Sequence, residues 1–165
     1  MSRRAAAALP VDSSLFFQLV RVVNLTARPF SESIGKAHRL GLNAWRVLIV
    51  VANHPGVAAS EVAEFSGLDK MAVSRAVAEL VRDGRVVRRT DAADKRRMHL
   101  HPSAEGRRLY ARIGTPARER ERMLFRGIGD AERQRLAATL ERLIANLVDD
   151  GDPHPGPLPR SGRGS

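Results

Sequence analysis

The sequence predicts a mainly α-helical protein that carries one small β-hairpin. Apolar residues recur at helical spacing in several segments, two short helical segments flank a tight link at 66–69, and a basic hairpin pattern follows at 85–101. Two short helices around such a link, followed by a hairpin, predict a winged helix-turn-helix fold, in which the second short helix is presented outward. The predicted class is therefore mainly α with a small β-wing.

Two helices are predicted before the link. The first can be capped by Asp12 or Ser13 and ends near Pro29. Its apolar residues have the offsets of one helical face: Leu15, Phe16, Leu19, Val22 and Val23. The second runs from Leu42 to Asn53 and is stopped by the turn residues at 54–56. Its apolar stripe consists of Trp45, Leu48, Ile49 and Ala52.

The link itself joins a very short helix to a longer one. Ser60 can cap the first of these, and Gly67 ends it because glycine tolerates a positive φ. Asp69 caps the second helix, which closes at Gly84. The inward-facing residues are Val62 and Phe65 on the first helix and Val73, Val77 and Leu80 on the second.

A hairpin and two further helices complete the chain. Segments 85–90 and 97–101 predict two antiparallel strands of a wing, joined by a loop at 91–96. Ser103 can cap the long polar helix that follows, and Pro116 predicts a kink or a break in it because proline lacks an amide proton. The last helix, about 130–149, carries a regular apolar stripe: Leu136, Leu140, Leu143, Ile144 and Leu147.

The predicted organisation is one folded domain with an unstructured segment at each end. Residues 1–11 are expected to be flexible, 12–149 to fold as one domain, and 150–165 to be a disordered tail rich in proline and glycine. Within the domain, the winged helix-turn-helix occupies about 42–102. Helices at 12–37 and 103–149 flank it.

The charge of the chain favours a polyanionic partner. Its 28 Lys and Arg residues against 18 Asp and Glu give a formal net charge of +10. A nucleic acid is favoured over an anionic membrane surface as the partner, because the cations lie on the hairpin and not on an amphipathic helix. A basic excess that serves only solubility is the remaining alternative.

Composition also bounds the chemistry and the compartment. The chain has no cysteine, which excludes disulfides, thiolate zinc sites and thiol redox sensing. The apolar run in MSRRAAAALP is too short for a signal peptide or a membrane span. A cytoplasmic, nucleoid-associated location without a membrane partner is expected.

The segment from Leu40 to Gly106 resembles the core of the MarR family of transcription regulators. The resemblance is carried by LGLNAWRVL, by ASEVAEFSGLDKMAVSRAVAELVRDGRVVRRTDAADKRR and by SAEG at the start of a long helix, and the order of elements extends it to about 12–148. It implies a dimeric regulator of double-stranded DNA without a cofactor. Repression of a palindromic operator is the expected activity.

The second short helix carries the predicted base contacts. Arg75 is assigned to base recognition, because its planar guanidinium can pair with both acceptors of guanine. Ser74 and Lys70 are expected at phosphates, Met71 points outward beside them, and the hydroxyl of Ser60 sits at a helix start that can bind phosphate. The alternative is that these cations form only a solvated face.

The wing supplies the second set of predicted DNA contacts. The resemblance places Arg96 in the minor groove, with Lys95 and Arg97 as neighbours, and Arg88 adds a cation to the first strand. Asp94 is expected to support the wing by holding a nearby arginine. Such density of positive charge in a hairpin is costly unless a polyanion relieves it.

Dimerisation is assigned to the apolar stripes near both termini, whose alternative is an intrachain core. The residues are Leu15, Phe16 and Leu19 in the first helix and Leu140, Leu143, Ile144 and Leu147 in the last. Two recognition helices related by a two-fold axis bind half-sites about one turn of DNA apart.

The resemblance further implies a small phenolic or aromatic effector that releases DNA. Candidate residues for its cleft are Phe17, His38, Trp45 and Arg46. The alternative for Trp45 is a simple core position.

Other functions find less support. The five histidines are scattered and none is spaced for catalysis, so no enzyme is predicted. His99 and His101 share one face of a strand but lack a neighbouring carboxylate or thiolate at ligand spacing, so no metal site is predicted. The alternative function is an architectural or protein-interaction winged-helix module with non-specific DNA affinity.

Overall fold

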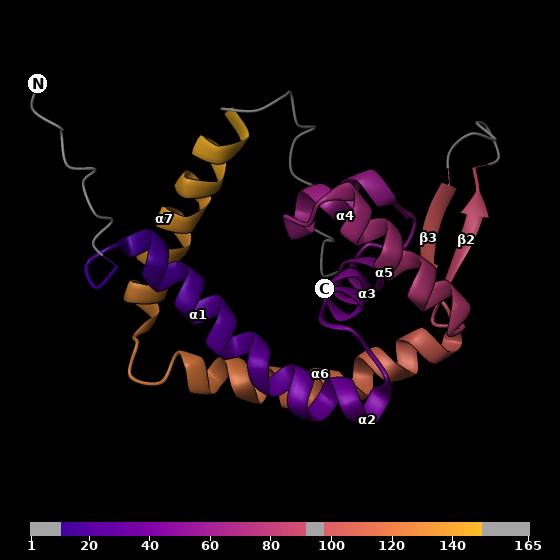
Figure 1. Ribbon diagram of the computed structural model, residues 1–165, viewed down its shortest axis with the longest axis horizontal. Helices are drawn as coiled ribbons and strands as arrows, with labels where there is room; N and C mark the ends of the chain where they lie inside the picture. The colour runs from indigo at the N-terminus through magenta and orange to yellow at the C-terminus, as the bar shows by residue number, and fades with distance from the viewer. Residues whose placement is uncertain (1–10, 92–97, 150–165) are drawn as a thin grey trace, which may run out of the picture. The chain divides into compact units, whose positions relative to one another are not determined.

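The computed structural model describes residues 11–91 and 98–149, and the chain divides into two compact units, 1–42 and 43–165 (Figure 1). The first unit contains α1 (Leu15–Pro29), the π-helical turn η1 (Phe30–Gly35) and α2 (Lys36–His38). The second contains nearly all of α3 (Leu42–Asn53) and everything after it. Within the described residues no helix is both long and apolar enough to cross a membrane.

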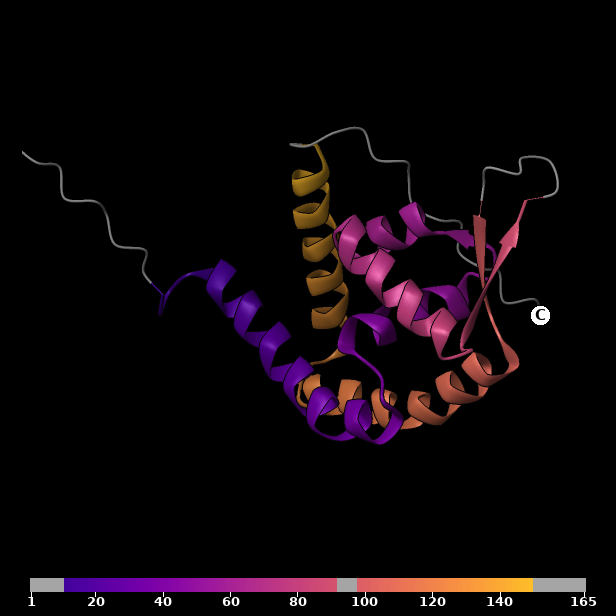
Figure 2. The same cartoon turned by 45° about the vertical axis from the view of Figure 1, so that its right-hand side comes forward.

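The first helix begins one residue later than predicted and ends at Pro29 as predicted. Ser14, rather than Asp12 or Ser13, is its N-cap, and its Oγ accepts a hydrogen bond from the amide of Phe17 at 3.3 Å. The helical path then continues through η1 and α2, as the indigo and violet ribbon in Figure 2 shows. A wider π-helical turn follows Pro29, whose ring removes one backbone hydrogen bond from the ladder. Arg39 ends the run in a left-handed conformation, with φ of 47°.

Helix α3 has the predicted bounds but is buried on more than one side. Val47, Leu48 and Val51 are fully enclosed, whereas Ile49 and Ala52 of the predicted stripe are half-exposed. The predicted buried face of α3 was therefore too narrow, because an apolar helix at the centre of a domain is buried on most of its sides. Helices α4 (Ala59–Ser66) and α5 (Lys70–Arg82) follow it.

The wing is part of a three-stranded sheet and not a two-stranded hairpin alone. Strands β2 (Val86–Thr90) and β3 (Met98–Pro102) form the predicted hairpin, and β1 (Val57–Ala58) pairs with the other edge of β3 in the order β1-β3-β2. All pairs are antiparallel, and Leu100 lies opposite both Arg88 and Val57. A strand of two residues is too short to show alternation, which explains why the sequence did not predict β1.

The core of the second unit is apolar and joins α3, α4, α5, α6 (Ala104–Leu124) and the sheet. Its most enclosed side chains are Leu48, Val62, Val73, Val77, Leu80, Val86, Leu100 and Ile113. No polar or charged residue is buried among the described residues. The inward face predicted for α5 is confirmed, but Phe65 of α4 is 58% exposed and lies beside the ring of His54.

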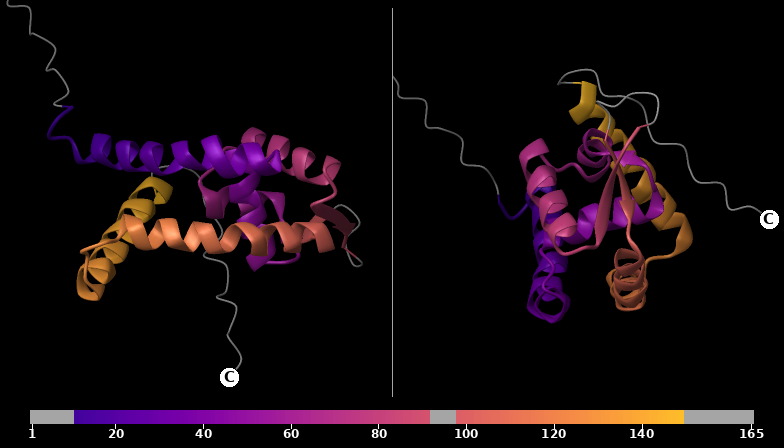
Figure 3. Two further views of the ribbon diagram at one scale, coloured as in Figure 1. Left: turned by 90° about the horizontal axis from the view of Figure 1, so that it is seen from below. Right: turned by 90° about the vertical axis from the view of Figure 1, so that its right-hand side faces the viewer.

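The last two helices extend beyond this core. Helix α6 is capped by Ser103, whose Oγ accepts from Gly106 N at 3.0 Å. It continues through Pro116 to Leu124, so of the predicted kink or break the break does not occur, and Figure 3 shows α6 as one orange helix. A turn containing Gly127, at φ of 80°, separates it from α7 (Asp130–Asp149). Residues 130–147 are all exposed in the single chain.

Gly106 marks a close approach between α6 and the start of β2, which yields a stability prediction. A Cβ at this position would overlap the carbonyl oxygen of Arg85, which already accepts from Ser103 N at 3.0 Å. Gly106→Ala should therefore lower the free energy of unfolding by about 1–3 kcal/mol, measured by urea denaturation.

Gly114→Ala is the matched control on the same helix. A Cβ there meets only the end of the Arg118 side chain at 3.5 Å, so this change should be neutral or stabilising by roughly 0.5–1 kcal/mol. Equal stability of the two variants would contradict the close approach.

Candidate nucleic-acid interface

The turn between α4 and α5 fixes where α5 begins. Gly67 ends α4 with φ of 65°, and Asp69 is the N-cap of α5, with Oδ1 accepting from Ala72 N at 2.7 Å. Both predicted roles are confirmed. Because the cap satisfies an amide that would otherwise lack a partner, the first turn of α5 is held helical at the surface.

The start of α4 is organised by Glu61 and not by Ser60. The helix begins at Ala59, and Glu61 Oε2 accepts from the backbone amide of Ala58 at 2.7 Å. Ser60 is therefore the second residue of the helix instead of its cap, and its side chain is exposed. The prediction for Ser60 as a cap was wrong by two positions, because a glutamate within reach of the preceding amide can close the turn by itself.

The outer face of α5 carries the side chains assigned to DNA. Lys70, Met71, Ser74 and Arg75 are exposed, and Met71 is 65% exposed although it is apolar. Their opposite face is held by the buried residues Ala72, Val73, Ala76, Val77 and Leu80. The four side chains are thus available at the surface, and their contact with DNA stays a prediction.

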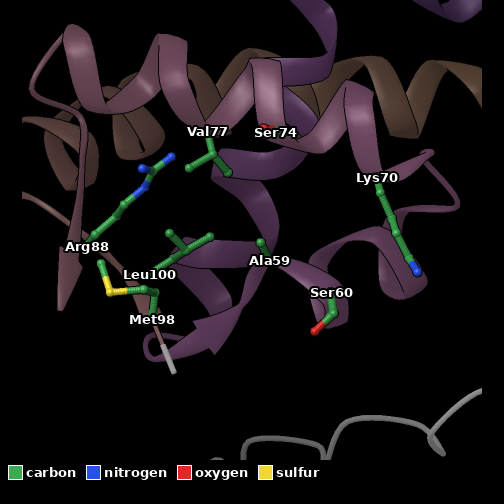
Figure 4. A pocket seen from close by; sticks show the side chains of 8 residues that line it. All are labelled: Ala59, Ser60, Lys70, Ser74, Val77, Arg88, Met98 and Leu100. Atoms are coloured by element: carbon green, nitrogen blue, oxygen red, sulfur yellow. The ribbon is translucent and has the colours of Figure 1, made fainter. Parts of the chain in front are cut away.

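A shallow hollow of about 330 Å³ brings four of the predicted residues together. It is lined by Ala59, Ser60, Lys70, Ser74, Val77, Arg88, Met98 and Leu100. Figure 4 shows Arg88 and Lys70 at opposite sides of it, with Val77, Leu100 and Ala59 between them. Two cations and two hydroxyls around an apolar floor can donate hydrogen bonds to an anionic ligand such as a nucleic-acid phosphate.

The wing contributes exposed cations from β2. Arg88 and Arg89 are both exposed, and Arg88 lies opposite Leu100 in the register, on the sheet face that meets the hollow. The remaining predicted wing residues, Asp94, Lys95, Arg96 and Arg97, lie outside the described residues. Their assignments stay predictions.

One polar contact at the base of the wing was missed by the sequence analysis. His99 Nδ1 lies 2.6 Å from the carbonyl oxygen of Gly56, and His99 Nε2 lies 2.9 Å from Asp91 Oδ2. These two acceptors raise the pKa of His99, the Gly56 carbonyl most and the Asp91 carboxylate next. The available signal was the position of Asp91 at the start of the predicted hairpin loop and of His99 on the strand that returns from it.

The second histidine of β3 behaves in the opposite way. Burial lowers the pKa of His101 first, and the charges of Arg89 and His99 lower it further. The pKa values of the two histidines on this strand face are therefore shifted in opposite directions. The ring nitrogens of His99 both face oxygen acceptors.

The residues proposed for an effector site lie in both compact units. Trp45 is only 7% exposed and its ring lies 6.0 Å from that of Tyr110, which agrees with the alternative core role. Arg46 donates from a guanidinium nitrogen to Asn43 Oδ1 at 3.4 Å. Phe17 is 46% exposed on α1, and His38 is half-exposed at the end of α2. A ligand role for these four residues stays a prediction.

The stripes assigned to dimerisation are exposed in the single chain. Leu140 and Leu143 of α7 are 37% and 40% exposed, and Leu147 is 77% exposed. On α1, Leu15 and Phe16 are about three-quarters exposed. Apolar side chains gathered on one helix and left uncovered usually mark a protein interface.

Comparison with known proteins identifies related regulators. The sequence profile of the MarR family matches residues 40–97. A Thauera aromatica protein described as a transcriptional regulatory protein for the hcr operon is 30% identical over 129 residues, 78% of each chain. The homoprotocatechuate degradative operon repressor of Escherichia coli is 26% identical over 119 residues, 72% of this chain and 80% of that protein.

Solved structures share the fold over most of the chain. A MarR/EmrR family transcriptional regulator from Acinetobacter sp. ADP1 is 26% identical with a TM-score of 0.78, covering 87% of this chain and 100% of that one. CouR from Rhodococcus jostii RHA1, solved with p-coumaroyl-CoA bound, is 25% identical with a TM-score of 0.74, covering 83% and 96%.

The N-cap of α5 gives a stability prediction. Asp69→Ala leaves the Ala72 amide without its acceptor and should cost about 1 kcal/mol of unfolding free energy, measured by urea denaturation. Asp69→Ser keeps an acceptor oxygen at this position and should stay close to the wild type. If the alanine and serine variants unfold at the same urea concentration, the cap does not stabilise α5.

Proposed function

Because the chain belongs to the MarR family of transcriptional regulators and is not an enzyme, we propose that it is a sequence-specific repressor, active as a homodimer on a palindromic operator in double-stranded DNA. The observation that carries the proposal is the hollow beside the start of α5, where Lys70, Ser74 and Arg88 gather next to Arg75 on the outer helix face. A nucleoid-associated, cytoplasmic location follows from this partner.

Recognition would divide between α5 and its surroundings. An α-helix fits the major groove, and Arg75 can pair there with the two acceptors of a guanine edge. Lys70 and Arg88, on either side of the hollow, would neutralise phosphates of the same groove and so fix the register of the helix. The wing residues Lys95, Arg96 and Arg97 would extend the contact into the minor groove, with Asp94 supporting them.

The dimer is supported by the uncovered apolar side chains on α1 and α7. One recognition helix contacts only a few base pairs, and a second copy about one turn of DNA away multiplies the specificity. A 20-residue helix with every residue of 130–147 exposed gains little stability from its own chain. Burial of its leucine stripe against a second copy would supply the missing packing energy.

An effector of aromatic character is part of the proposal. The Escherichia coli relative is named as the repressor of a homoprotocatechuate degradative operon, and the Rhodococcus structure holds p-coumaroyl-CoA. We therefore propose that a small phenolic or aromatic compound, free or as a thioester, releases this chain from DNA. Phe17, His38, Trp45 and Arg46 stay the candidate contacts.

Selection of binding sites from random duplex DNA at physiological salt tests the function directly. Enrichment of an inverted repeat, with half-sites about one helical turn apart, is the expected result. Binding that fades with rising salt and enriches no motif would instead favour an architectural module with non-specific DNA affinity.

Arg75→Ala should relax the base preference at one position in each half-site. The loss of a bidentate guanine contact is expected to reduce discrimination there by about 1–3 kcal/mol, measured by repeating the selection with the variant. Arg82→Ala is the matched control, since Arg82 is exposed at the end of the same helix and pairs with Asp83. An unchanged motif with Arg75→Ala would remove this residue from base recognition.

Leu143→Glu should shift the protein toward the monomer, because a charge in the apolar stripe would be buried without a partner. Ala138→Glu places the same residue on the opposite face of α7 by the helical period and should leave the dimer intact. Light scattering coupled to size exclusion measures both masses. Dimers of equal stability in both variants would exclude the α7 stripe from the interface.

A further inference from the structure

We propose that His99 is a positioning residue of the wing. Its imidazole, protonated on both nitrogens, donates to the carbonyl of Gly56 and to the carboxylate of Asp91. This bridge, called the tie below, holds Asp91, the residue that directly follows β2. The effect on DNA rests on the proposed function, whereas the tie itself is a property of the free protein. The wing would consequently be set for DNA binding at lower pH and released as pH rises.

Both ring nitrogens of His99 face atoms that accept hydrogen bonds. The carbonyl oxygen of Gly56 can only accept, so the short contact to His99 Nδ1, 2.6 Å, requires a proton on that nitrogen. The carboxylate of Asp91 also accepts, so the 2.9 Å contact to Nε2 requires a proton there as well. A histidine that donates from both nitrogens is a cation.

Loss of the proton breaks one of the two contacts. A neutral imidazole keeps a single N–H, so either Gly56 or Asp91 would face a nitrogen lone pair instead of a donor. An ionised carboxylate against a lone pair is repulsive. Because Asp91 directly follows the last residue of β2, loss of this contact would remove the link between that position and β3.

The charged groups around His99 favour its cationic form. Asp91 follows β2 and Glu61 lies on α4, and both carboxylates raise the pKa of His99. Arg89 of β2 lies opposite His99 in the register, and the pKa of His101 of β3 is lowered by burial, by Arg89 and by His99. Partial burial opposes protonation, but the two direct acceptors outweigh it.

The sign of the pH dependence follows. The pKa of His99 is raised in the folded protein, so the tie is fully present below the pKa of an unfolded-chain histidine. It is lost as pH rises through the folded-state pKa. The affinity for DNA should therefore fall as pH rises through the raised pKa of His99.

Nuclear magnetic resonance of the imidazole nitrogens in the free protein tests the tie without DNA. We expect the His99 ring to stay protonated on both nitrogens to a higher pH than the His101 ring, and its pKa to fall in the Asp91→Asn variant. A His99 ring that titrates no higher than His101 in the wild type, or that is unaffected by Asp91→Asn, would overturn the proposal.

Fluorescence anisotropy at constant ionic strength tests the consequence for DNA. The probe is the duplex enriched by selection, or a mixed-sequence duplex of the same length if selection enriches none. The wild-type affinity for DNA should fall at least about threefold as pH rises through the folded-state pKa of His99. The His99→Gln variant should lose this pH dependence, and the matched control His101→Gln should retain it. Parallel curves for the wild type and His99→Gln would overturn the role in DNA binding.

The Asp91→Asn variant distinguishes the positioning role of His99 from a simple electrostatic effect of the Asp91 charge on DNA binding. Removal of a negative charge beside DNA should strengthen binding if electrostatics alone matters, whereas loss of the tie should weaken it. The Asp91→Asn/His99→Gln double variant should bind no more weakly than either single variant, because both remove one interaction. Stronger binding by Asp91→Asn, or additive losses, would contradict the proposal. Failure to bind either duplex would contradict the proposed function. The nuclear magnetic resonance measurement on the free protein would still test whether His99 bridges Gly56 and Asp91.

Discussion

The packing of one face of α5 against the core determines almost everything presented on its other face. Val73, Val77 and Leu80 are between 0% and 2% exposed, and their burial fixes the rotation of the helix about its axis. With the rotation fixed, Ser74 and Arg75 can only point outward. The N-cap at Asp69 sets the position along the axis. The candidate interface is therefore a consequence of core packing and not of any contact among the outward residues themselves.

Much of this arrangement could be predicted from the sequence. The inward residues of α5, its Asp69 cap, the Gly67 turn and the bounds of α3 follow from period, cap chemistry and positive φ, which are local rules. The hairpin and its position next to α5 were also predictable. These features share one property: each depends on residues within a few positions of one another.

The parts that the sequence did not predict depend on partners far apart or on competition between rules. Strand β1 exists because Val57 meets Leu100, a residue distant in the chain. At the start of α4 the side chain of Glu61, and not that of Ser60, accepts the hydrogen bond from the Ala58 amide. Pro116 lies inside α6 and does not end it, although proline removes one backbone hydrogen bond from the helix. The contact from His99 to Gly56 and Asp91 required the sheet to be assembled before it could be recognised.

The exposure of α7 links protein concentration to folding. A helix of this length without buried residues over 130–147 is only marginally stable by itself, and a partner that covers its leucines becomes part of its stability. For the proposed dimer, association and ordering of α7 are then one equilibrium, governed by mass action. A cell that holds few copies of the chain would keep part of them as frayed monomers, so the number of molecules made would itself regulate how many are competent.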